Sequence, residues 1–388
     1  MNNKINLISN PFKDDDYVSQ LNDDGCIKFH KSLPGYSHTP LIELDKYSEI
    51  MKIQSLQIKD ESKRFNLNAF KSLGASYAMA KILLSRIGSN KADLNYQTLK
   101  ENKETIKDLT FVTATDGNHG RAVAWSSEIY GCQAYVYLPK GSSKHRLKAI
   151  ESHGAFAEIT DLNYDETVIH AAEIAEQNNW ILIQDTSWIN YEVIPKHIMI
   201  GYQTIVHEFL KDPHIWPSHV IMQAGVGSFA ASVFDAFCVP GMPKPIFILA
   251  EPEGAACYFK SVQVADGSAH SINNLKTIMA GLSCGVPSIL AWDIIKSTVD
   301  YFITCHDEVA LQAMRRLAHP TESDPSIVSG ESGAMTTGII EQICINPKYS
   351  EYKDLIMLDQ SSNVFCISTE GDTNPELYRE ALEPSIAP

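Results

Sequence analysis

The fold is decided by the stretch LTFVTATDGNHGRAVAWSSEIYGCQAYVYL, residues 109–138. Residues 109–114 are a short apolar run rich in β-forming side chains, the polar loop DGNHG follows, and residues 119–130 have the composition of a helix. Residues 134–138 are a second apolar run. A strand, a helix and another strand in this order predict a parallel βαβ unit.

The same alternation continues along the chain. We expect helices over residues 144–152 and 164–177, and strands over residues 155–159, 180–184, 219–223, 245–250 and 364–367. Repeated units of this kind predict an α/β fold with parallel-rich twisted sheets that are flanked by helices. Ligands of such sheets bind at the carboxyl ends of the strands, where most of the distinctive polar segments of this sequence stand.

Length, charge and cysteine usage narrow the class of protein. The 388 residues exceed the roughly 250–300 at which a single core stops growing, so two domains are expected. The net charge of −15 disfavours nucleic acid as a partner, because an acidic surface repels phosphates. The sequence has no apolar run of membrane-spanning length and no apolar signal core. Eight scattered cysteines without a CxxC pair or metal-ligand spacing indicate a cytoplasmic protein with no metal site.

The segment AGVGS follows the expected strand at 219–223 and precedes a helix. Gly225 and Gly227 permit close approach of the backbone, and successive amides at a helix N-terminus bind phosphate. A glycine turn that only links the strand to the helix explains this segment equally well. The spacing matches neither GxGxxG nor a Walker loop, which favours a smaller phosphorylated cofactor over a dinucleotide or a nucleoside triphosphate.

One lysine stands in an apolar stretch, RFNLNAFKSLGASYAMAK, residues 64–81. Lys71 lies between Phe70 and Leu73 there. Partial desolvation would lower its pKa and free the amine as a nucleophile. When this segment is considered alone, the commoner explanation is that the lysine lies at the start of a helix and extends its side chain to solvent.

Three further loops carry polar groups at the ends of expected strands. DGNHG contains Asp116 and Asn118, QDTSW contains Asp185, and STEGDTN begins with Ser368 and Thr369. Each could be no more than a helix cap or a turn. An apolar-flanked lysine, an asparagine loop, a glycine loop and a terminal hydroxyl in this order are nevertheless the parts that hold pyridoxal 5′-phosphate (PLP).

The sequences and the order of these segments resemble those of the fold-type-II PLP enzymes of the tryptophan synthase β superfamily and, within that superfamily, those of the diaminopropionate ammonia-lyases. The matching segments are NAFKSLGAS, ATDGNHGRAVAW, QDTSW, IMQAGVGSFA, IMAGLSCGVP, SGESGAM and STEGDT, which span residues 65–378. The resemblance implies a homodimer of two-domain subunits. We expect the large PLP-binding domain to comprise residues 1–80 plus 215–388 and the small α/β domain to comprise residues 81–214.

The resemblance also implies where the cofactor is held. Lys71 would carry PLP in a Schiff base, and Asn118 would contact the cofactor O3′. Ser368, with Thr369 as the alternative, would face the pyridine nitrogen. The phosphate would be bound by Gly225, Val226, Gly227 and Ser228.

The two aspartates would act as proton acceptors. Asp116 is implied for the D form of the substrate and Asp185 for the L form. The small amino-acid substrate would be 2,3-diaminopropionate, which loses ammonia by α,β-elimination to give pyruvate and two ammonia in all.

Two other functions stay open at this point. A serine or threonine dehydratase-like ammonia-lyase, or a β-replacement synthase, would use the same fold, but neither needs an acidic residue at position 116. A PLP-fold protein that only binds an amino acid and regulates a partner would be indicated by loss of the lysine, and Lys71 is present.

Overall fold

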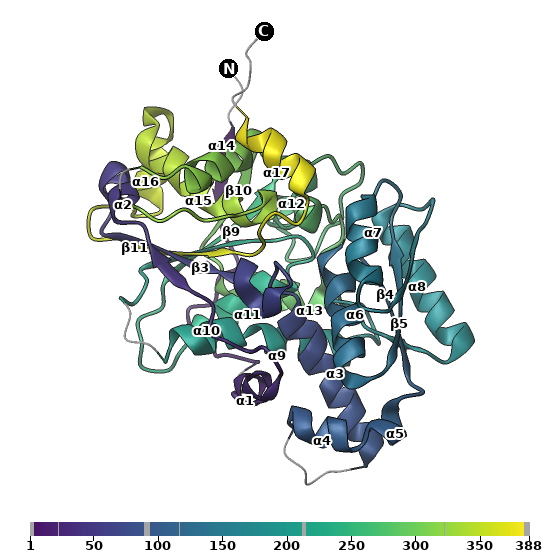
Figure 1. Cartoon of the computed structure of the whole chain (residues 1–388). Coiled ribbons are helices and arrows are strands. Elements are labelled where there is room, and N and C mark those ends of the chain that lie inside the picture. The colour runs from purple at the N-terminus through teal and green to yellow at the C-terminus, as the bar shows by residue number, and fades with distance from the viewer. Residues whose placement is uncertain are drawn as a thin grey trace.

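Two β-sheets organise the chain, one of seven strands and one of four (Figure 1). The computed structural model describes residues 4–21, 23–88, 94–115, 117–211, 215–321 and 323–383. Within these ranges, no helix combines the length and the apolarity that crossing a bilayer requires. The predicted α/β fold with parallel-rich sheets and flanking helices is confirmed.

The seven-stranded sheet has a parallel centre and antiparallel edges. Its strands, in spatial order, are β1 (Ile5–Ser9), β10 (Tyr301–Cys305), β9 (Ile246–Pro252), β8 (His219–Gln223), β11 (Asn363–Ser368), β3 (Ser55–Asp60) and β2 (Leu41–Glu43). The five central strands pair in parallel, while β1 and β2 pair antiparallel to β10 and β3. The carboxyl ends of the central strands therefore gather at one edge of the sheet.

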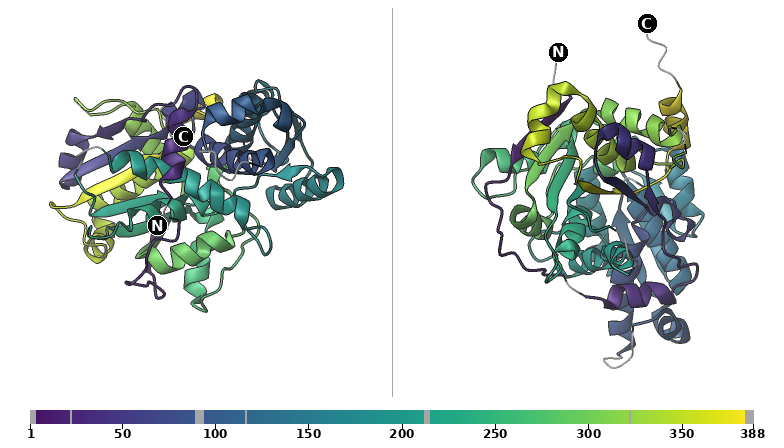
Figure 2. Two further views of the ribbon diagram at one scale, coloured as in Figure 1. Left: turned by 90° about the horizontal axis from the view of Figure 1, so that it is seen from below. Right: turned by 90° about the vertical axis from the view of Figure 1, so that its left-hand side faces the viewer.

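The four-stranded sheet is parallel throughout. Its order is β6 (Phe156–Ile159), β5 (Gln133–Leu138), β4 (Thr110–Ala114) and β7 (Ile181–Leu182). The part of the chain that holds it lies to one side of the larger sheet (Figure 2). The predicted domain boundary at residue 81 falls inside a helix, α3 (Ser72–Ile87), and the boundaries stay a prediction.

Helices cover both sheets. They are α1 (Gly25–Ser32), α2 (Asp45–Met51), α3, α4 (Tyr96–Glu101), α5 (Lys103–Ile106), α6 (Asn118–Tyr130), α7 (Lys144–Glu151), α8 (Tyr164–Asn178), α9 (Val193–Tyr202), α10 (Thr204–Phe209), α11 (Ser228–Phe237), α12 (Cys257–Val264), α13 (Ile289–Thr298), α14 (Asp307–Ala318), α15 (Glu331–Ile345), α16 (Ser350–Leu355) and α17 (Pro375–Leu382). Between β4 and β5 the predicted helix is α6, as the strand, helix, strand pattern requires.

Alternation along the strands separates two cores. In β8, Val220 and Met222 join a cluster with α3, α9 and α11, whereas Ile221 joins a cluster with α14 and α15 on the other face. Side chains of successive strand residues point to opposite faces, so a strand buried on both faces carries apolar residues at consecutive positions, as Val220, Ile221 and Met222 do. The first cluster also contains Phe111 and Val136 of the small sheet, so one core joins the two sheets.

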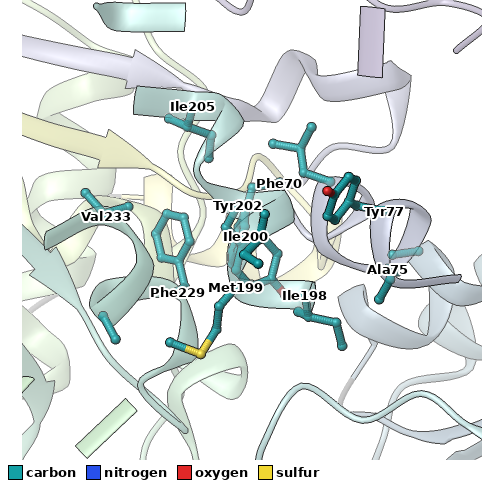
Figure 3. Packing of buried hydrophobic residues seen from close by; sticks show 14 of the residues in the cluster. Phe70, Ala75, Tyr77, Ile198, Met199, Ile200, Tyr202, Ile205, Phe229 and Val233 are labelled. Atoms are coloured by element: carbon teal, nitrogen blue, oxygen red, sulfur yellow. The ribbon is translucent and has the colours of Figure 1, made fainter. Parts of the chain in front are cut away.

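The helices α3, α9 and α11 meet beside the carboxyl ends of the central strands. Phe70, directly before the start of α3, packs on Phe229 of α11 with 3.9 Å between ring centroids and on Tyr202 of α9 with 4.9 Å. Figure 3 shows this aromatic contact within the apolar cluster. This packing holds the backbone next to Lys71 in place, so the position of the Lys71 Cα is fixed.

Candidate active site

One cavity brings together the segments that the sequence singled out. Its walls include Lys71, Asn118, Asp185, Gly225, Val226, Gly227, Ser228 and Thr369. These residues come from the start of α3, the start of α6, the segment after β7, the turn between β8 and α11, and the end of β11. Asp116, the other predicted proton acceptor, lies outside the residues that the structure describes.

The lysine side chain meets a carboxylate in this cavity. Lys71 Nζ lies 2.6 Å from Asp185 Oδ2, and the lysine side chain is only 13% exposed. Its Nζ also lies 5.4 Å from the centre of the Phe70 ring. The predicted apolar surroundings of Lys71 are present, and the side chain points into the protein instead of extending to solvent.

Asp185 is buried and ionised. Burial alone would raise its pKa, but the positive charge of Lys71, followed by that of His119 and the hydrogen bond from Lys71, outweighs it and sets the pKa at about 2. His119 Nε2 is 2.8 Å from the carbonyl oxygen of Ile183 and must donate to it. That bond turns His119 Nδ1 toward the carboxylate, 3.8 Å from Asp185 Oδ2.

The turn before α11 has the shape of an anion cradle. Gly227 precedes the helix with a φ of +89°, and no side chain caps the first amides of α11. A Cβ on Gly227 would lie 2.0 Å from Tyr258 Oη, and one on Gly225 would lie 3.0 Å from the carbonyl oxygen of Gly281. Glycine is therefore required at position 227, little room is left for a side chain at position 225, and the uncapped amides at the helix N-terminus suit a phosphate.

The hydroxyl of Ser228 already has a partner. Ser228 Oγ donates to the backbone carbonyl oxygen of Asp185 at 2.6 Å. This bond ties the glycine turn to the segment that carries the carboxylate. The backbone amide of Ser228, and not its hydroxyl, is the group that fits a phosphate.

The end of β11 offers one hydroxyl to the cavity. Thr369 lines it, and Thr369 Oγ1 accepts a hydrogen bond of 3.1 Å from Gln223 Nε2. Ser368 is not among the lining residues, and its hydroxyl bonds to Ser329 Oγ at 2.8 Å. This placement favours Thr369, the alternative, over Ser368 as a group that could meet the pyridine nitrogen.

Comparison with known proteins identifies the family. A family model described as "Pyridoxal-phosphate dependent enzyme" matches residues 33–358. The diaminopropionate ammonia-lyase of Salmonella typhimurium is 45% identical over 366 residues, which cover 92% of this chain and 90% of the relative. The chain belongs to the diaminopropionate ammonia-lyase family. The lyase of Escherichia coli K12 is 39% identical over 92% of this chain and 89% of its own length.

A solved structure of this lyase family agrees with the fold. The crystal structure of the Escherichia coli diaminopropionate ammonia-lyase in complex with an aminoacrylate-PLP azomethine reaction intermediate superposes with a TM-score of 0.88. It is 37% identical in sequence and covers 98% of this chain and 97% of its own. That protein binds PLP, and the cavity described above has the groups that PLP requires.

Several residues of this lyase cavity were not assigned a role from the sequence. They include His119, Tyr164, Tyr202, Gln223, Ser332 and Glu370, all of which line the cavity. His119 and Glu370 stood inside quoted motifs, but nothing in the sequence relates His119 to Asp185 or Glu370 to Asn118. Tyr164 and Tyr202 begin or end ordinary amphipathic helices, so no local signal separates them from core tyrosines.

Proposed function

We propose that the protein converts the D and L forms of 2,3-diaminopropionate, with one water, into pyruvate and two ammonia by α,β-elimination. The observation that carries this proposal is the Lys71–Asp185 pair, with 2.6 Å between Nζ and Oδ2, in a cavity that also holds the amides at the start of α11. A nucleophilic amine, a carboxylate base and a phosphate cradle are what PLP-dependent removal of an amino group needs.

The cofactor would be held at four points. Lys71 would bind it covalently, and the amides of the turn from Gly225 to Ser228 would bind its phosphate. Asn118 would meet its O3′. Thr369 accepts from Gln223, so its own hydroxyl hydrogen can be donated to the pyridine nitrogen. A hydroxyl donor in place of a carboxylate leaves that nitrogen largely unprotonated.

The carboxylates would move the proton. When bound, PLP supplies an electron-withdrawing ring that acidifies the α-carbon of the substrate. Asp185 would take the α-proton of the L form, and Asp116 would take that of the D form. The Lys71 ammonium is one cause of the low pKa of Asp185, so this carboxylate becomes a stronger base whenever Lys71 is neutral.

The leaving group and the product follow from the substrate. Once the α-proton is lost, the β-amine, which must be protonated to ammonium to leave, departs as ammonia, and the released aminoacrylate reacts with water to give pyruvate and the second ammonia. Burial of the cavity limits the access of water to the reacting atoms. Asp185 is only 3% exposed, which supports a proton transfer away from bulk solvent.

The arrangement of the subunit adds three proposals. We propose a large domain of residues 1–80 plus 215–388, a small domain of residues 81–214, and a cytoplasmic homodimer. The four strands of the small sheet, all within residues 110–182, support the small domain. Light scattering of the purified protein tests the dimer, and a monomer at micromolar concentration would contradict it.

The stoichiometry of the products tests the function. With added PLP, 2,3-diaminopropionate should give two ammonia for each pyruvate, because both amino groups leave, whereas serine can give only one. Pyruvate is measured with a coupled dehydrogenase and ammonia in the same sample. A ratio of one, or no pyruvate from diaminopropionate while another amino acid is consumed, would exclude the proposal.

A further inference from the structure

A second buried carboxylate, that of Glu370, lies at the cavity. Glu370 follows Thr369 at the end of β11 and is only 2% exposed. Asn118 Nδ2 donates to Glu370 Oε2 at 2.5 Å, although the two residues are 252 positions apart in the chain. This bond links the start of α6, beside the four-stranded sheet, to the end of a strand of the seven-stranded sheet.

Glu370 is fixed in place by other contacts. Thr373 Oγ1 donates to the same oxygen, Oε2, at 3.1 Å, and the amide of Ser332 donates to Oε1 at 3.3 Å. The backbone of Glu370 forms an isolated antiparallel bridge with Ala69, two residues before Lys71. The carboxylate is therefore a rigid acceptor, held by the same segments that position Lys71 and Thr369.

A carboxylate can only accept hydrogen bonds, which decides how the Asn118 side chain is turned. Its amide nitrogen, and not its amide oxygen, must face Glu370. The nitrogen carries two hydrogens, so one bonds to Glu370 and the other can be donated to an oxygen in the cavity. Without an acceptor at position 370, the carboxamide could rotate by half a turn and present its oxygen, which repels the O3′ oxygen of PLP.

We propose that Glu370 is a positioning residue that sets the orientation of Asn118 toward the cofactor. This inference rests on the proposed role of Asn118 in the PLP site. Glu370 acts on the cofactor site through its hydrogen bond with Asn118, and no contact with the substrate is assigned to it. Its effect on cofactor binding passes entirely through Asn118.

A double-mutant cycle on PLP affinity tests the proposal. Glu370→Ala should weaken PLP binding by the apo-protein about tenfold, the value of one oriented hydrogen bond. Asn118→Ala should weaken it to a similar extent. The double variant should bind PLP no more weakly than Asn118→Ala alone, because residues that act through one contact are not additive. Affinity is read from cofactor absorbance and from the visible circular dichroism of the bound ring.

Two matched variants separate positioning from charge and from folding. In Glu370→Gln, the donors Asn118 and Thr373 both require the amide oxygen at the Oε2 place. The amide nitrogen then replaces Oε1 and loses the 3.3 Å bond from the Ser332 amide, which lowers stability but leaves Asn118 oriented, so PLP affinity should stay within about threefold of the original. Thr373→Val removes another donor to Glu370 without touching Asn118 and should change PLP affinity by no more than about twofold. If Glu370→Ala melts below the assay temperature, Glu370→Met fills the volume without an acceptor and replaces it.

The outcomes separate the role of Glu370 from the role of Asn118. Additive losses in the double variant, or unchanged PLP affinity in Glu370→Ala, would overturn the role of Glu370. Unchanged PLP affinity in Asn118→Ala would instead overturn the assignment of Asn118 within the proposed function. A fall in melting temperature without a change in PLP affinity or dichroism would show that Glu370 is only structural.

Discussion

Lys71→Ala should abolish turnover of 2,3-diaminopropionate, with a loss of at least about a thousand-fold, because no other amine replaces the covalent attachment point. PLP should still bind, but only through its phosphate and ring contacts. Reduction of the original protein with borohydride should fix the cofactor onto the peptide that contains Lys71, as seen by mass spectrometry. The alanine variant should release all of its PLP on denaturation after the same treatment.

The ion pair with Asp185 calls for a second variant. Alanine at position 71 leaves the buried Asp185 carboxylate without its nearest cation, which could lower stability as well as activity. Lys71→Arg keeps a positive charge beside Asp185 but cannot form a Schiff base. It should keep a melting temperature close to the original and still lose turnover. Substantial activity in either variant, or borohydride labelling at a different lysine, would contradict the assignment.

Asp185→Asn should cut turnover of L-diaminopropionate by about a hundred-fold to ten-thousand-fold, which is the usual contribution of a general base. The D form should be largely spared. The proposed reason is geometric: the Cα–H bond must stand perpendicular to the cofactor plane to break, and each aspartate would accept the proton of one enantiomer only. Asparagine keeps the shape of the side chain, so the loss should fall on kcat more than on KM.

Asp116→Asn should show the reverse selectivity, with the D form impaired and the L form spared. Pyruvate release from each pure enantiomer by each variant measures both effects. Asp165→Asn, which changes a carboxylate next to the cavity-lining Tyr164, is the control and should impair neither form. Equal losses on both enantiomers in one variant would mean that its aspartate is structural or that a single base serves both faces.

Seven of the eleven strands that the structure describes were predictable because they are locally distinctive. The strand at 219–223 has the same limits as β8, since it is a short apolar run that ends at a glycine turn. The edge strands β1 and β2 and the central strands β3 and β10 were missed. β3 reads SLQIKD, and its polar residues Gln57 and Lys59 are buried through contacts with Glu43 and Glu208, which only the tertiary structure supplies.

The candidate site was predictable as a set of segments but not as a geometry. Lys71 and Asp185 were named from separate motifs, and their 2.6 Å contact joins residues 114 positions apart. Sequence could not choose between Ser368 and Thr369 either. Neighbouring residues at the end of a strand point to opposite sides, and which side holds the cavity depends on what packs there.

The relative rates on competing amino acids distinguish an ammonia-lyase for diaminopropionate from a dehydratase. We would measure kcat/KM for diaminopropionate, L-serine and L-threonine with the PLP-loaded protein under one set of conditions. We expect a value for diaminopropionate at least about tenfold above those for the two hydroxy amino acids, since the protein belongs to the diaminopropionate ammonia-lyase family. A higher kcat/KM for serine or threonine would contradict it and would assign the protein to the dehydratases instead.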